Sequence, residues 1–436
     1  MRHLSLASQA SILSSLARSA TIAQRLRQFI KAVFELQSQY LGGKNKPTRT
    51  LEAFADAVDA EVRALDAWCA AREEAMCRAW GGAGIIDANG DMQPLVISLL
   101  GTEKDVRDVF DGTFDVLLDV LTEVYPSGIS NTTRSGSAAM LSTMLLDKLF
   151  EKVQRHLERQ EVVTSEALMR VFVRTAEPMW AMIGKWLRDG MGLGMGIGVG
   201  MSGGAEELED EFFIEGSGLG LGMMGTGLLD PEFWKEGYAL REGVIFDEDA
   251  RDAERKRKTI PQFLEHVAEP VLGAGKALGL LRALGVPPSS FPSSGMPQWQ
   301  TFGKLVGLSS SSSSSAVQLN SEEDNTGNRL FSVSIDTLSR LIYDRLLPQC
   351  DVVGALLARV MVDECALWTH LASIEDLFLM RKGDAMSHFV DILFAKVCFL
   401  RSSEVSLCLI NHAILCRWMP NNHGVISISS IRLSGT

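Results

Sequence analysis

The sequence has little of what a binder of nucleic acid or a membrane-spanning protein needs. Its 436 residues carry 42 Lys and Arg against 54 Asp and Glu, a formal net charge of −12. Binding to phosphates or to anionic lipid requires clustered cations, which an acidic chain does not supply. No apolar run reaches the roughly 20 residues of a membrane-spanning helix, and the most apolar stretch, 389–400, contains Asp391 and Lys396. We therefore expect no nucleic acid and no membrane as partner.

Aromatic residues, cysteine and histidine are also scarce. Aromatics make up 7% of the chain, so a core would consist mainly of Leu, Ala, Val and Met. The 7 cysteines have no regular spacing, which is typical of reduced, mostly buried thiols of an intracellular protein. The 7 histidines form no Ser/His/Asp or Cys/His pattern, and Cys408, His412 and Cys416 on one helix cannot converge around zinc. We expect no enzyme, no catalytic residue, no cofactor and no metal.

Helical periodicity, by contrast, runs through most of the chain. It predicts helices over 5–40, 48–80, 92–101, 103–125, 138–160 and 164–189, and again after 330. Strand signals are short, at 211–215 and 243–246. The predicted fold class is all-α, with elongated stacked helical bundles, long disordered inserts and room for one small β-hairpin. Residues 1–34 lack acidic groups, as a mitochondrial transit peptide would, but their apolar spacing favours the first helix of the fold.

Three low-complexity or aberrant segments divide the chain. Residues 190–228 form a Gly/Met-rich and acidic insert, and 285–329 form a Pro/Ser-rich linker with serines at 309–315. Such compositions bury too little apolar surface to order themselves, so we expect disorder. The linker is interpreted as an inert spacer, with control by phosphorylation as the alternative. Residues 397–436 lose the helical pattern, and we expect an aberrant tail, such as an unspliced intron or a frameshift would produce.

A formal G-x-G-x-x-G occupies residues 198–203 but lacks the context of a dinucleotide site. It follows a helical pattern rather than a strand, and it leads into five carboxylates within 206–211. A dinucleotide fingerprint needs a preceding strand and a helix N-terminus that meets the phosphates, and carboxylates would repel them. The run is therefore interpreted as a loop.

The segment around Gly275 and Lys276 looks like a phosphate-binding loop but departs from that pattern twice. Pro270 stands at the place of the first glycine, and Ala277 replaces the hydroxyl residue that would hold Mg²⁺. We interpret the segment as a helix within a bundle. A nucleotide-dependent enzyme remains the alternative, and it predicts ATP or NAD binding that is lost in Lys276→Ala.

Short motifs follow one another in a fixed order between residues 186 and 384. Their residues are Trp186; Glu211, Phe212, Phe213 and Ile214; Trp234, Tyr238 and Arg241; Gly275 and Lys276; and Gly383 and Asp384. In this order they resemble the gamma-tubulin complex components, the family that includes fungal spindle pole body components. The resemblance covers about residues 50–396. These positions define the fold and are not catalytic, and the Gly-Lys pair is then explained without a nucleotide.

The resemblance implies a structural role in microtubule nucleation. Family members are helical scaffolds whose N-terminal bundles pack laterally against other gamma-tubulin complex components, and whose C-terminal domains bind gamma-tubulin. Here 1–284 would be the N-terminal bundle region and 330–396 the helical start of the C-terminal domain. The location implied is the cytoplasm and cytoskeleton, at the microtubule-organising centre or spindle pole body.

Two further expectations follow from how the resemblance ends. The match stops near Lys396, so the chain as written is expected to bind gamma-tubulin only weakly or indirectly. Its long inserts suggest the divergent component-five or component-six class. The alternative is a generic helical scaffold or tethering-complex subunit without gamma-tubulin association.

Overall fold

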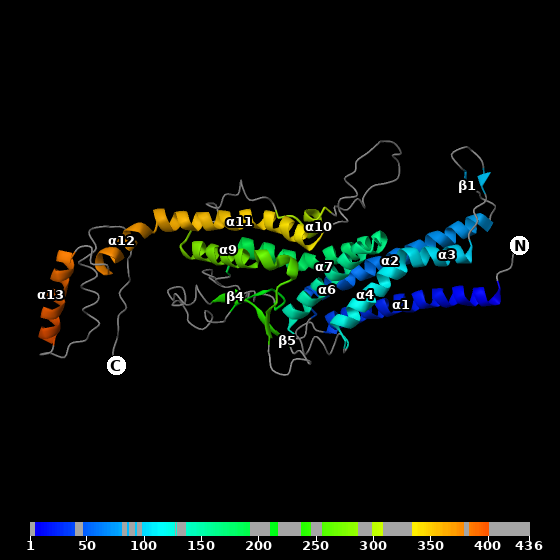
Figure 1. Cartoon of the computed structure of the whole chain (residues 1–436), viewed down its shortest axis with the longest axis horizontal. Coiled ribbons are helices and arrows are strands. Elements are labelled where there is room, and N and C mark those ends of the chain that lie inside the picture. The colour runs from blue at the N-terminus through cyan, green and yellow to red at the C-terminus, as the bar shows by residue number, and fades with distance from the viewer. Residues whose placement is uncertain are drawn as a thin grey trace. The chain divides into compact units, whose positions relative to one another are not determined.

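The computed structural model confirms an all-α protein (Figure 1). It describes residues 5–39, 47–80, 85–86, 92–93, 98–126, 128, 137–191, 210–216, 237–245, 255–286, 299–307, 334–378 and 383–400. The chain divides into two compact units, Met1–Val360 and Met361–Thr436. Most of the Gly/Met-rich insert, most of the Pro/Ser-rich linker and the tail after 400 lie outside the described residues, and the disorder expected there stays a prediction.

The first unit is a bundle of long helices with shorter connecting ones. Its helices are α1 (Leu6–Gln39), α2 (Arg49–Trp80), α3 (Leu99–Val106), η1 (Arg107–Asp111), α4 (Gly112–Val124), α6 (Ala138–Glu158), α7 (Val162–Asp189), η2 (Gln262–Leu264), α9 (Glu265–Ala283), α10 (Phe302–Leu305) and α11 (Ile335–Asp363). The helix expected over 92–101 is wrong in its first part. Met92–Gln93 (β2) pairs instead with Ile85–Ile86 (β1), and the helix begins after Ser98, whose hydroxyl accepts from the Gly101 amide.

Helix α7 lies at the centre of this unit. It packs against α2 and α6 on one side and against α9 and α10 on another. Phe172, on α7, is fully buried and meets the rings of Phe150 at 4.9 Å and Phe263 at 5.5 Å. Trp180 and Trp186, also on α7, are both buried.

Short antiparallel strands connect the helices near the middle of the chain. Ile214–Gly216 (β3) pairs with Tyr238–Leu240 (β4), and Glu242–Ile245 (β5) pairs with Arg255–Lys258 (β6). Together with β1–β2, the described residues thus hold three strand pairs, where the sequence suggested one hairpin. Two- to four-residue strands give too short an alternation to be read from the sequence.

The Pro/Ser-rich linker is not disordered throughout. Trp299–Gly307 are ordered, Phe302 and Val306 are buried, and α10 packs against α7. The expectation of disorder over 285–329 is therefore wrong for this stretch, because its aromatic and aliphatic side chains bury enough surface to order it.

The thiols also differ from expectation. Cys69 and Cys77 are exposed on α2, whereas Cys350 is buried. The last buried residue of α2 is Val62, and Leu65 and Trp68 after it are only partly buried against the core, so Cys69 and Cys77 lie where the helix leaves the bundle. The expectation of mostly buried thiols is therefore wrong for this helix.

The second unit contains α12 (Leu367–Phe378) and α13 (Gly383–Leu400). Apolar side chains at Trp368, Ile374 and Phe394 are exposed. Gly383 and Asp384 open α13, where a carboxylate suits the positive end of the helix dipole. Among the described residues no helix is long and apolar enough to cross a membrane.

Candidate functional site

The structure gathers several motif residues around Trp186, in the last turn of α7. The indole Nε1 donates a hydrogen bond of 2.8 Å to the Val271 carbonyl of α9. Its ring lies 6.3 Å from that of Phe212 and 5.4 Å from that of Tyr238. Trp186 therefore joins α7 to α9 and to the β3–β4 pair, and Phe213 and Ile214 extend the same core.

Gly275 belongs to this cluster because α9 crosses α7 too closely for a side chain there. A Cβ atom at Gly275 would lie 2.5 Å from Cζ2 of Trp186, well inside van der Waals contact. The Gly275 carbonyl also accepts from the Met191 amide at 3.1 Å, just after Gly190 turns the chain with a φ of 66°. Helix packing therefore requires the glycine.

Lys276 sits in the middle of α9, not on a phosphate-binding loop. Partial burial lowers its pKa, and the Glu269 carboxylate opposes that shift. A phosphate cradle needs free backbone amides in a loop before a helix N-terminus. In α9 the amides around Gly275 and Lys276 belong to the helix interior, so this geometry favours the structural interpretation over nucleotide binding.

Glu211 is a buried carboxylate that fastens two helices to the strand pair. Its Oε1 accepts from the Thr50 amide and the Ser142 hydroxyl, each at 2.8 Å, and its Oε2 accepts from the Arg49 amide at 2.8 Å. Arg49 and Thr50 begin α2, so the carboxylate caps that helix and neutralises its dipole. We call Glu211 with these three partners the Glu211 clasp.

Arg241, which directly follows β4, joins that strand to β3 and to the residues before it. Its guanidinium donates to the Asp210 carbonyl at 2.8 Å and lies 3.6 Å from the Glu215 carboxylate. Its own amide donates to the Phe213 carbonyl at 2.8 Å. Among the other predicted motif residues, Trp234 lies outside the described residues, and Gly383 and Asp384 belong to the second unit.

Sequence reasoning missed a second cluster, built by residues 299–307 on α7. The Trp180 indole donates to the Gln300 carbonyl at 2.8 Å, and its ring stacks on Trp299 at 4.7 Å. The Glu177 carboxylate accepts from the Phe302 amide at 2.8 Å. The signal was present in the sequence, since Trp299 and Phe302 are large aromatics inside a Pro/Ser-rich tract.

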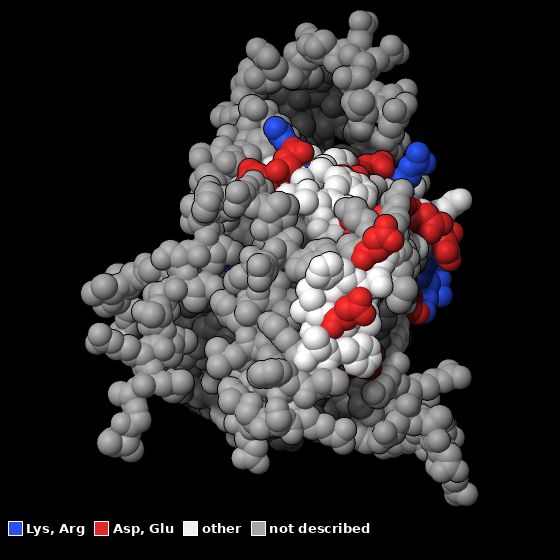
Figure 2. Space-filling view, turned by 90° about the vertical axis from the view of Figure 1, so that its left-hand side faces the viewer, with Lys and Arg blue, Asp and Glu red and all other residues white. Residues whose placement is uncertain are grey.

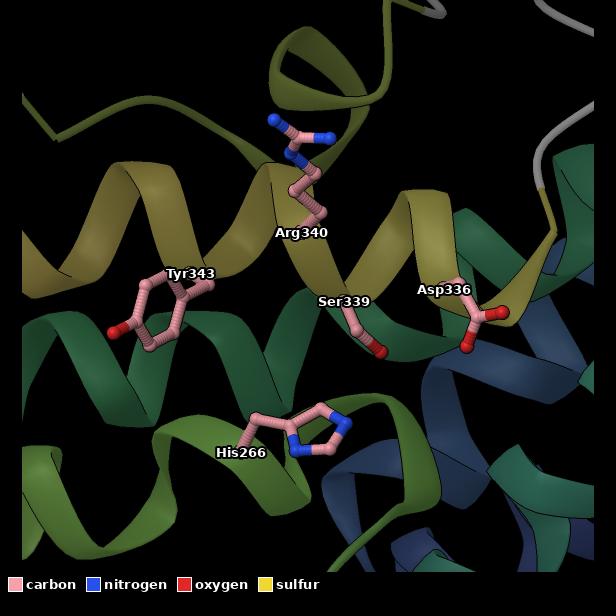
Figure 3. Close-up of a pocket in the computed structure, with 5 residues that line it drawn as sticks. All are labelled: His266, Asp336, Ser339, Arg340 and Tyr343. Carbon is pink, nitrogen blue, oxygen red and sulfur yellow. The ribbon is translucent and has the colours of Figure 1, made fainter.

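A shallow cavity of about 460 Å³ lies between α9 and α11 (Figure 3). His266, Asp336, Ser339, Arg340 and Tyr343 line it, and the Ser339 hydroxyl and Asp336 carboxylate lie on the side of α11 that faces His266. Within the described part of the chain no hydrogen bond joins the three, and the buried Ser339 Oγ has no partner. An activated serine needs a base within hydrogen-bond reach, so the cavity gives no support for catalysis.

The charge of the drawn surface agrees with the acidic composition. Among the described residues visible in Figure 2, acidic side chains lie between uncharged ones and basic ones lie at the margin. These residues present no cationic stripe for phosphates in that view.

Helix α1 offers the clearest candidate for contact with another helix. Its inner side is buried against α2 and α4, through residues such as Leu26 and Val33. Its outer side carries a second apolar stripe, which includes Leu13. The outer α1 stripe consists of Leu6, Ala10, Leu13, Ala17 and Ala20, all exposed.

The spacing of the outer α1 stripe is that of a helix–helix seam. Its residues alternate steps of four and three, the spacing of the a and d positions in a heptad. Leu6 is 84% exposed and Leu13 is 57% exposed. Three alanines between and after them leave room for the backbone of a second helix to approach.

Comparison with known proteins assigns a family to this chain. The family model described as gamma tubulin complex component N-terminal matches residues 1–364. No curated protein matches the chain significantly. The matched range contains α1 to α11, and with them the Trp186 cluster and the Glu211 clasp.

Proposed function

This chain belongs to the gamma-tubulin complex component family, and from that premise we propose that it supports microtubule nucleation through lateral assembly of its N-terminal helical bundle. The family's members are structural components of a complex rather than known enzymes. The role we propose is accordingly that of a scaffold, located in the cytoplasm at the microtubule-organising centre or spindle pole body.

The outer α1 stripe is the observation that carries lateral assembly. Burying a leucine side chain contributes about 1.5–3 kcal/mol relative to leaving it in water. Leu6 and Leu13 are exposed in the single chain, so this stabilisation is not realised there. The two leucines lie seven residues apart, on the same face of α1. A helix of a neighbouring component, packed along the stripe, would recover it.

The proposed partners are other gamma-tubulin complex components, with gamma-tubulin bound weakly or indirectly by the 436 residues given. The match is to the N-terminal model of the family, whereas gamma-tubulin binding is implied for the C-terminal domain. We place the start of that domain after α11 instead of at 330. Leu338, Ile342 and Leu346 of α11 belong to the core of the first unit, and the match extends to 364.

We keep the component-five or component-six class as part of this proposal, on the long inserts of the sequence. Membership of the family favours this function over a generic tethering-complex subunit. At the segment around Gly275 and Lys276, the position of both residues inside a helix argues against the nucleotide-dependent alternative.

The experiment is co-purification of the chain with other components of the family after co-expression. In Leu6→Glu/Leu13→Glu, two carboxylates on the outer α1 stripe should reduce recovery of the partner component at least tenfold, since burying unpaired charge is unfavourable. Val352→Glu provides a matched control, because Val352 is an exposed aliphatic residue on α11. Unchanged recovery with the double variant, or equal loss with the control, would contradict the assignment of the stripe.

A further inference from the structure

Residues 299–307 contact α7 in the manner of a bound peptide. Trp299 stacks on Trp180 with an interplanar angle of 26°. The backbone of the segment is held at two points, by the Trp180 indole at the Gln300 carbonyl and by the Glu177 carboxylate at the Phe302 amide. Side-chain pockets combined with main-chain hydrogen bonds are the usual means of recognising an extended segment.

The α7 groove that receives the segment is shaped for two aromatic residues three positions apart. The Phe302 ring is fully buried, 5.6 Å from Trp180, 6.1 Å from Phe263 and 6.2 Å from Phe172. At the other end of the groove, Gly184 leaves the space that Trp299 fills. A Cβ atom at Gly184 would lie 2.7 Å from the Trp299 Nε1.

The segment is joined to the rest of the chain by sequence of quite different character. Pro, Ser and Gly dominate residues 287–298 before it, and the serine run lies within 308–333 after it. At about 3.5 Å per residue, the twelve residues before the segment span at most ~40 Å and the longer tract about 90 Å. These lengths allow the segment to reach a groove other than its own.

We propose that the α7 groove, formed by Glu177, Trp180 and Gly184, is a peptide-binding site for a Trp-x-x-Phe segment. Residues 299–307 fill it as a tethered ligand, and the same segment of a second copy of this chain fills it in trans. The occupant is assigned to a second copy because the segment already matches every pocket, and because the tethers on its two sides are 12 and 26 residues long, which allows it to leave its own groove. This inference is independent of lateral assembly through α1.

Two variants of the full chain separate ligand from groove. Trp299→Ala/Phe302→Ala leaves the groove intact and removes its ligand. Gly184→Ala leaves the ligand intact but puts a methyl group where Trp299 binds in the groove. The change should not weaken α7 itself, because alanine has a higher helix propensity than glycine. Gly354→Ala on α11 is the matched control for the glycine change, because a Cβ atom there meets nothing within 4 Å.

The test measures association by analytical ultracentrifugation of the two variants, alone and mixed. The expected result is a one-to-one complex in the mixture only, weakened at least tenfold when Trp180→Ala is added to the first variant. A mixture that stays monomeric, while both variants keep wild-type helix content, overturns exchange between copies. Association of either variant alone to the same extent overturns it as well.

A second measurement decides the question even if the double variant does not fold. Protease sites are inserted within 287–298 and 308–333 of the otherwise native chain, and both are cleaved. The excised segment should co-elute with the protein and be displaced by excess synthetic peptide of residues 297–308, but not by that peptide with alanine at 299 and 302. Loss of cooperative unfolding on cleavage, or a segment that the peptide never displaces, would show that it is an integral part of the fold.

Discussion

Trp186 and Gly275 face each other across the contact of α7 with α9, and the indole occupies the space that a side chain at 275 would need. Gly275→Ala should therefore lower the free energy of unfolding by roughly 1–3 kcal/mol, the usual cost of overpacking a core. Gly273→Ala, two positions away on the same helix, meets nothing within 4 Å and should raise stability by up to about 1 kcal/mol through helix propensity.

Urea denaturation of the two glycine variants checks this prediction. Equal stabilities for Gly275→Ala and Gly273→Ala would show that Trp186 moves aside without cost, and the close approach of α7 and α9 would then not explain the glycine.

Glu177, in the groove on α7, should make the stability of the folded protein depend on pH. Burial raises the pKa of its carboxyl, and the hydrogen bonds from the Phe302 and Gly303 amides offset only part of that. A raised pKa in the folded state means that protonation favours folding. The stability that protonation of Glu177 adds to the folded state is fully present below the unfolded pKa near 4.5, and it is lost as pH rises through the folded pKa.

Relative to Glu177→Gln, the wild-type protein should therefore gain stability as pH falls from 7 towards 4.5. The difference between the two proteins isolates this group, because Asp111, whose pKa burial also raises, titrates in both. Thermal unfolding midpoints across that pH range provide the measurement. A difference that is constant, or that shrinks as pH falls, would contradict the assignment.

At the scale of residues, the sequence identified positions but not their partners. A family pattern singled out Gly275 and Glu211, but it does not predict their partners. Gly275 packs against the Trp186 indole, and Glu211 accepts a hydrogen bond from the Thr50 amide. Glu211 reaches Thr50, which is 161 positions away, and such a contact leaves no trace in local spacing. Trp299 and Phe302 were missed because their neighbours dominated the composition of the tract.

At the scale of elements, the Glu211 clasp holds the start of α2, the side of α6 and the strand pair together. Glu211→Gln replaces an acceptor-only carboxylate with an amide whose NH₂ group faces the donors on Thr50, Arg49 or Ser142. Hydrogen bonds to a buried charged group contribute about 1.5–3 kcal/mol each in favourable cases, so we expect a loss of roughly 1–3 kcal/mol.

Chemical denaturation again measures the effect, with Glu158→Gln as the matched control. Glu158 is exposed at the end of α6, and its substitution should change the free energy of unfolding by less than about 0.5 kcal/mol. If Glu211→Gln behaves like this control, the carboxylate is not what fastens the N-terminus of α2.

Elements were predicted best where one apolar stripe runs for several turns. The helices expected over 48–80, 138–160 and 164–189 match α2, α6 and α7 closely. The first part of 92–101 was wrong, because a two-residue strand pair is set by its partner and not by its own pattern. Helix α1 shows a subtler limit, since its sequence carries two apolar stripes and local periodicity does not say which one the fold buries.

At the scale of the whole molecule, the motif residues of the first unit serve helix packing. The Trp186 cluster and the Glu211 clasp fix how α2, α6, α7 and α9 meet, and neither presents groups arranged for catalysis. Among the described residues, the outer α1 stripe leaves Leu6 and Leu13 exposed on one face of a helix. The proposed function follows from that stripe and from membership of the gamma-tubulin complex component family.

The most direct test of this account is affinity purification of the tagged chain from its native cells, with partners identified by mass spectrometry. We predict that other gamma-tubulin complex components are recovered with it, and that Leu6→Glu/Leu13→Glu removes them while the chain stays folded. Recovery of none of these components with a soluble, helical wild-type chain would contradict the proposal that it assembles with them.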